Sequence, residues 1–124
     1  KAMKDIGGDY PVTSMAGFGL TGTSDNLQGA IDGETFEFTQ MYPAYIAVAE
    51  MQGEKTAVRA MKYAIEAEKI HAELFAKAKE AVDEGKDLEA KEMLLCPVCG
   101  FISLTGEEDR CPLCNAKKEI FKSY

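Results

Sequence analysis

Four cysteines near the C-terminus constrain the fold of this chain more than any other feature of its sequence. They form two C-P-x-C groups, with Cys96 and Cys99 in the first and Cys111 and Cys114 in the second, separated by eleven residues. This spacing predicts that four thiolates bind one metal ion with tetrahedral geometry. Zinc and a single iron ion both accept four sulfur ligands, so a purely structural zinc ribbon is the alternative to an iron site.

The residues next to the cysteines favour a metal site over disulfides. The first 95 residues contain no cysteine, so disulfide bonds could stabilise only the last part of the chain. Gly100 follows the first C-P-x-C group and Asn115 follows the second. Both residue types tolerate a left-handed backbone, which allows tight turns whose amide groups point at sulfur.

Two long segments upstream have the periodicity of packed helices. In residues 25–52 and 54–84, residues at candidate core positions recur at alternating spacings of four and three. We expect Ser24 or Asp25 to cap the first helix and Pro43 to kink it. This pattern predicts a mainly α-helical chain with bundle-type packing.

The remaining segments and the composition narrow the class of protein further. Residues 7–24 contain five glycines and one proline, which predicts a long connecting loop, and residues 86–95 form a charged linker. Fourteen basic against 21 acidic residues give a net charge of −7, which argues against nucleic acid or an anionic membrane as a partner. Neither a long apolar run nor a secretory leader is evident, so we expect a soluble, cytoplasmic protein.

Acidic residues occupy or adjoin positions where the helical pattern predicts a core. Glu34, Glu68 and His71 lie on the predicted core faces, and Glu37 follows Glu34 by three residues. None of the three glutamates has a lysine or arginine one helical turn away, and the segment from Asp5 to Glu54 contains eight acids and no basic residue. Ionised carboxylates are rarely buried without a partner, so a proton, another helix or a metal ion must neutralise them.

The spacing of these residues favours a metal. Each one alone could be a protonated acid or a hydrogen-bonded core histidine. Together, Glu-x-x-Glu on one helix and Glu-x-x-His on the next place two ligands on each of two helix faces. A di-iron helical bundle uses one glutamate from each of two helices and Glu-x-x-His from each of the other two, so this chain supplies half of the set. Such ligands suit iron or manganese better than a closed zinc site.

The longer motifs resemble those of the rubrerythrin family over nearly the whole chain. They are GETFEFTQMYPAYIAVAE, EAEKIHAELF, CPVCG and CPLC, in this order and near an aromatic C-terminus. The resemblance implies a ferritin-like helical bundle with a di-iron site, followed by a small rubredoxin-like domain that holds one iron on four cysteines. It implies three regions: a crossover loop at 1–24, a helical pair at 25–88 and the rubredoxin-like domain at 89–124.

The resemblance also implies roles for individual residues. Glu34, Glu37, Glu68 and His71 match di-iron ligands of the family, and Tyr42 matches a tyrosine near that centre. Cys96, Cys99, Cys111 and Cys114 match the ligands of the mononuclear iron. The implied activity is a peroxidase that reduces hydrogen peroxide in defence against oxidative stress, with electrons from a reductase or a rubredoxin. The resemblance leaves open whether electrons pass from the cysteine-bound iron to the di-iron site within one chain or between subunits.

One departure from the family pattern is large. The first two helices of the family, with their own glutamate and Glu-x-x-His, have no counterpart here. The missing half could come from a second chain or from a homodimer, or this sequence could be a fragment. A non-catalytic iron-storage protein, or a zinc-stabilised electron-transfer or interaction module, is the alternative to an enzyme.

Overall fold

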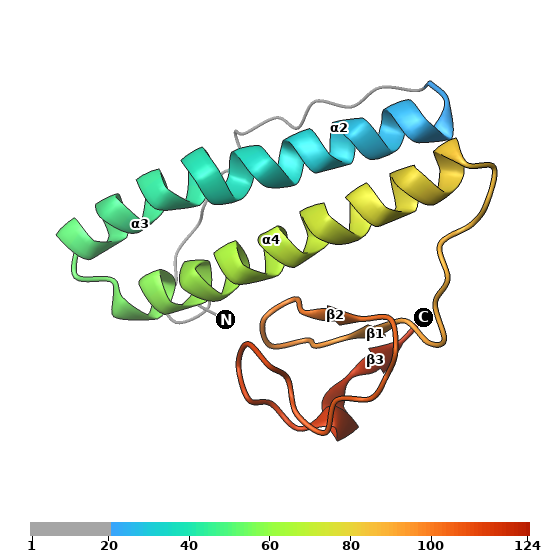
Figure 1. Cartoon of the computed structure of the whole chain (residues 1–124). Helices are drawn as coiled ribbons and strands as arrows, with labels where there is room; N and C mark the ends of the chain where they lie inside the picture. The colour runs from blue at the N-terminus through green and yellow to red at the C-terminus, as the bar shows by residue number, and fades with distance from the viewer. Residues whose placement is uncertain (1–20) are drawn as a thin grey trace.

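Two antiparallel helical rods form the larger part of the molecule (Figure 1). In the computed structural model, which describes residues 21–124, the first rod consists of α2 (Thr23–Phe36), a π-helical turn (Glu37–Met41) and α3 (Tyr42–Met51). A short turn leads into α4 (Lys55–Asp83), which runs back along the first rod. Most of the predicted connecting loop at 7–24 lies outside the described residues.

The helix continues through Pro43 by widening one turn. We expected Pro43 to kink the helix, and the structure has a π-helical turn just before it, in which the Tyr42 N–H donates to the Glu37 carbonyl. The Thr39 hydroxyl donates to the Thr35 carbonyl at 2.5 Å. A π-helical turn shifts the hydrogen-bond ladder by one residue, and such turns are frequent at functional sites. This one begins at Glu37, a predicted ligand.

The start of α2 differs from our expectation. Gly22 is the N-cap residue, with extended backbone angles and no side-chain cap, whereas Ser24 and Asp25 lie inside the first turn. An acidic residue in the first turn still interacts favourably with the positive end of the helix dipole. The prediction of Ser24 or Asp25 as the cap was therefore wrong by two or three residues.

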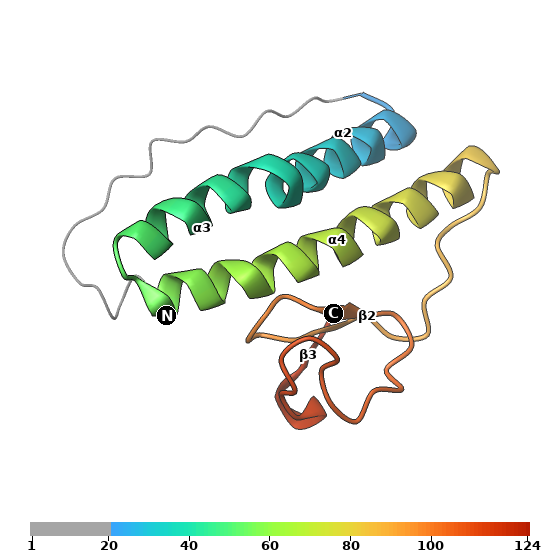
Figure 2. The same ribbon diagram turned by 60° about the vertical axis from the view of Figure 1, so that its left-hand side comes forward.

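The cysteine module, residues 94–124, is a small sheet and two tight turns. Its strands are β1 (Leu94–Leu95), β2 (Ile102–Ser103) and β3 (Lys122–Ser123), with β1 in the centre and antiparallel to both neighbours. A short 3₁₀ helix precedes β3. The buried centre of the module consists of Cys96, Cys99, Phe101 and Cys111. Figures 1 and 2 both show the module lying against α4.

The helical rods bury little of their own apolar surface. Among the described residues of α2 to α4, only Ala49 and Ala67 are buried. Four large apolar side chains of the first rod are about half exposed or more: Phe36, Tyr45, Val48 and Met51. Two helices cannot enclose a core, because each has an apolar face wider than its single contact. No helix of the described part is long and apolar enough to cross a membrane.

Candidate metal centres

Two groups of side chains in the described residues have the composition and geometry of metal sites. The first consists of Glu34 from α2 with Glu68 and His71 from α4, and one ligand atom from each lies within 4.8 Å of the others. His71 Nδ1 lies 2.7 Å from Glu68 Oε2 and 3.8 Å from Glu34 Oε1. The three side chains are only 15–20% exposed. We call this group the carboxylate site.

In the described ion pairs, the partner of Glu34 and Glu68 is His71, and no lysine or arginine compensates their negative charge. Partial burial, together with a hydrogen bond to Glu68 and the charges of Glu68 and Glu37, raises the pKa of Glu34 to about 8. Burial and the charge of Glu68 also raise the pKa of Glu37, while His71 opposes this change. The site therefore needs a proton or a cation, and a metal ion satisfies two carboxylates and an imidazole together.

Glu37 stands beside this group rather than inside it. Its backbone belongs to the π-helical turn, and its ligand atoms do not lie within the compact group formed by Glu34, Glu68 and His71. Its carboxylate still interacts electrostatically with Glu68 and His71. Its role as a ligand stays a prediction, whereas the structure brings the other three predicted residues together.

Tyr42 contacts the carboxylate site through its hydroxyl group. The hydroxyl donates to Glu68 Oε1 at 3.5 Å, which is a long hydrogen bond. Burial and the nearby charges of Glu68, Glu37 and Glu34 raise the pKa of Tyr42 to about 12. At neutral pH the phenol therefore keeps its proton and can act as a hydrogen-bond donor.

The second group is the cysteine site, formed by Cys96, Cys99, Cys111 and Cys114, whose sulfur atoms all lie within 4.8 Å of one another. The Cys96–Cys114 and Cys99–Cys111 sulfur distances are 3.6 and 3.4 Å, so no disulfide is present among them. This spacing suits thiolates that surround one ion.

Three thiols of the cysteine site have pKa values that are shifted in different directions. Burial opposes ionisation of Cys96, but backbone amides of Val98 and Cys99 hydrogen-bond its sulfur, and the net result is a lowered pKa. Burial raises the pKa of Cys99 and of Cys114. Four ionised sulfurs so close together need a cation, which is the condition that a bound metal fulfils.

Both predicted turn residues have a left-handed backbone. Gly100 has a φ of 88° and Asn115 has a φ of 61°. Their own amides donate to the carbonyls of Cys96 and Cys111, at 3.0 and 2.9 Å, rather than to sulfur. The turns instead direct the next amides along the chain, those of Phe101 and Ala116, to sulfur.

One histidine connects the two sites, a contact that the sequence pattern does not predict. His71 Nδ1 faces Glu68, and His71 Nε2 lies 2.9 Å from the carbonyl oxygen of Gly100, the residue after Cys99. Because a carbonyl can only accept, Nε2 must carry the proton, which leaves Nδ1 as the ring nitrogen available to a metal ion. The sequence carries no signal for this contact, because 29 residues separate its partners.

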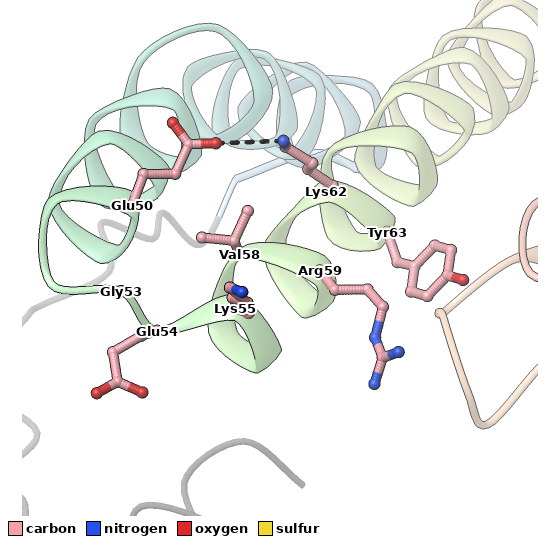
Figure 3. A pocket seen from close by; sticks show the side chains of 8 residues that line it. All are labelled: Glu50, Gly53, Glu54, Lys55, Val58, Arg59, Lys62 and Tyr63. Atoms are coloured by element: carbon pink, nitrogen blue, oxygen red, sulfur yellow. Dashed lines mark hydrogen bonds and ion pairs between the residues drawn. The ribbon is translucent and has the colours of Figure 1, made fainter.

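A cavity of about 500 Å³ lies elsewhere, at the turn between α3 and α4 (Figure 3). Lys62 forms an ion pair there with Glu50, at 3.2 Å. None of the predicted metal ligands lines this cavity. Tyr63 lines it and also packs against the buried centre of the cysteine module.

The fold and the two sites define a ferritin-like helical protein with a rubredoxin-like four-cysteine domain. Residues 16–79 match the family model described as "Rubrerythrin". The chain belongs to the rubrerythrin family, whose members are iron-binding oxidoreductases.

Individual relatives agree with this assignment. The chain is 47% identical to Rubrerythrin-2 of Clostridium acetobutylicum, over 94% of this chain and 63% of that protein. It is 35% identical to Nigerythrin of Nitratidesulfovibrio vulgaris, over 80% and 48% of the two chains. A solved structure of nigerythrin in a partially reduced state superposes with a TM-score of 0.79 at 30% identity, covering 98% of this chain and 57% of that one. The chain thus spans about half to two thirds of the length of these relatives.

Proposed function

We propose that the protein reduces hydrogen peroxide to water with electrons that enter through the cysteine site. The observation that carries this proposal is the position of His71, whose two ring nitrogens face the two candidate metal sites. A mainly structural zinc ribbon would not need a hydrogen bond to a predicted ligand of the other site. Reduction of one peroxide to two waters consumes two electrons and two protons.

The residues fit iron at both sites. Glu34, Glu68 and His71, with Glu37 nearby, would supply half of the ligands for a pair of iron ions, and the four cysteines would hold one more iron. Iron pairs supply one electron from each ion, and a thiolate-bound iron carries one electron at a time. Glu34 and Glu37 lie on one rod and Glu68 and His71 on the other, so the packing of α2 on α4 sets the spacing of the ligands.

The remaining residues of the site position ligands and protons. The Tyr42 hydroxyl donates to Glu68, which orients this carboxylate, and the same proton can be offered to an oxygen atom bound beside it. The Gly100 carbonyl fixes the ring of His71 in the tautomer that leaves Nδ1 free to bind metal.

We also propose that two further helices complete the bundle. Half of a di-iron ligand set and half-exposed apolar faces on the first rod support this proposal. The added helices would come from a second copy of the chain or from another polypeptide segment. A metal-loaded monomer of 13.5 kDa with a complete di-iron site would contradict this part of the proposal.

Peroxide consumption by iron-loaded protein tests the activity. With an artificial one-electron reductant, we expect turnover with two electrons consumed per peroxide and loss of turnover in Glu68→Ala. Glu66→Ala is the matched control, because Glu66 lies on the same helix but is exposed and pairs with Lys69 at 2.7 Å. Consumption no faster than that by free ferrous iron would favour the non-catalytic alternative, an iron-storage or electron-carrier protein.

A further inference from the structure

We propose that Ala67 is a positioning residue that seats the cysteine module on α4 and thereby sets the rate of electron transfer between the two sites. This inference rests on the proposed function, because it concerns the same two sites. Ala67 is 2% exposed and is the more deeply buried of the two buried helix residues in the described rods. Its methyl group cannot bind metal, so its burial needs another explanation.

The module docks on a stripe of α4 that is distinct from the face bearing Glu68. Tyr63 and Ile70 pack against the buried centre of the module. Ala67 lies between them, at spacings of four and three, so the three residues share one helix face. Figure 3 shows the Tyr63 ring on the side of the helix that faces the ribbon of the module. His71, four residues after Ala67, lies at the border between this face and the carboxylate site.

Two small residues meet at the centre of this contact. A methyl group placed on Gly100 would lie 3.4 Å from the Ala67 Cβ and 3.9 Å from His71 Cε1. The contact between α4 and the module therefore consists of the Ala67 methyl group on the helix side and the Gly100 backbone, which has no side chain, on the module side. This close approach brings the Gly100 carbonyl to 2.9 Å from His71 Nε2. A larger side chain at position 67 would have to displace the backbone of the module.

Displacement would change the separation of the sites without removing any ligand. With iron bound at both sites, each transfer would move one electron from the cysteine-bound iron, oxidised from ferrous to ferric, to the iron pair of the carboxylate site, reduced by one electron. An external one-electron donor would reduce the cysteine-bound iron after each transfer, so two transfers would replace the two electrons that one peroxide consumes. Small displacements of reacting groups can slow a reaction by about a hundredfold, so Ala67→Leu should slow this step strongly.

The first test observes the docking itself and needs no activity. His71 is the single histidine of the chain, so selective ¹⁵N-histidine labelling gives one imidazole to follow. In zinc-loaded wild-type protein we expect an Nε2–H proton that exchanges slowly with water. Ala67→Leu should speed this exchange about tenfold or more, as expected when a hydrogen bond to a partly buried carbonyl is lost. Ala67→Gly, which leaves the space open, should keep the wild-type signal.

The second test observes electron transfer in iron-loaded protein. After full reduction and one addition of hydrogen peroxide, oxidation of the cysteine site is followed by its colour. Ala67→Leu should delay this phase about tenfold or more while both sites keep their iron, and Ala67→Gly should keep the wild-type rate. Ala76→Leu is the matched control, because Ala76 is exposed on the opposite face of α4. If Ala67→Leu does not fold, Ala67→Val gives the same comparison with a smaller added volume.

The outcomes separate this inference from the proposed function. Unchanged His71 exchange in a folded Ala67→Leu or Ala67→Val variant would overturn the docking role of Ala67. Altered exchange with unchanged electron transfer would overturn its effect on the rate. Failure of the wild-type protein to consume peroxide would overturn the proposed function, while the result of the histidine experiment would still decide how the module docks.

Discussion

The cysteine site and the carboxylate site differ in how much of each is local. All four cysteines come from one stretch of 19 residues, and three of them are buried within the module that they define. The carboxylate site takes residues from two helices and remains partly exposed. The ligands of a site built within one short segment are positioned by the turns of that segment alone. A site built across helices depends on everything that holds those helices together.

The largest effect on folding and metal binding is expected from removing one ligand of the cysteine site. Metal binding supplies about 10 kcal/mol or more of the folding free energy of small four-ligand modules. Cys111→Ser should therefore abolish metal binding by the module and unfold residues 94–124, because its described centre is built largely from the ligands themselves. Hydrogen exchange measured by mass spectrometry should show loss of protection there and retained protection in α4. Protection kept in both regions would mean that the module folds without its metal.

Removing a ligand from the carboxylate site should have a smaller and more confined effect. His71→Ala deletes one predicted ligand and the hydrogen bond to Gly100. We expect the metal content of the carboxylate site to fall sharply while the cysteine site keeps its ion. Elemental analysis together with the absorption of the cysteine site separates the two. Equal loss of metal at both sites would contradict two independently formed sites.

The pH dependence of stability tests the charge imbalance of the carboxylate site. The pKa of Glu34 is raised from 4.5 to about 8, so the folded, metal-free protein binds a proton that the unfolded chain releases. This proton stabilises the fold fully below the unfolded pKa, and its contribution is lost as the pH rises through the folded pKa. In protein whose carboxylate site is metal-free while the cysteine site keeps its ion, Tm should therefore fall between about pH 5 and pH 8.

Glu34→Gln is the control for this titration. An amide stays neutral at every pH, so most of the slope of Tm against pH should disappear in the variant. Metal should reverse the slope of the wild-type protein, because binding expels the Glu34 proton and becomes tighter as the pH rises. A slope that is the same in Glu34→Gln would assign the effect to other groups.

The smallest effect is expected at Tyr42. Tyr42→Phe removes a 3.5 Å hydrogen bond to Glu68 and should change the free energy of unfolding by about 1 kcal/mol or less. Metal content should stay unchanged, whereas the rate of peroxide consumption should fall if the phenol offers its proton to bound oxygen. Chemical denaturation and single-turnover kinetics measure the two effects separately. An unchanged rate would limit Tyr42 to orienting Glu68.

The sequence by itself determined the elements and the donor types. The period of the candidate core residues predicted both long helices within a few residues, and the two C-P-x-C groups predicted the four-sulfur cluster. The lack of cations near Glu34 and Glu68 along the chain indicated that both are candidate ligands, because a carboxylate without a nearby positive charge is costly to bury. These features are local, so neighbouring residues along the chain suffice to reveal them.

Only the tertiary structure decided how these parts meet. The hydrogen bonds shift by one residue in a π-helical turn ahead of Pro43, a local detail that the position of the proline alone did not reveal. Glu37 was set beside the compact group, and Gly100 was brought to His71 across the contact with Ala67. Such contacts join residues far apart in the sequence, and they depend on side-chain volume and backbone approach in three dimensions. Periodicity and spacing carry no information about either.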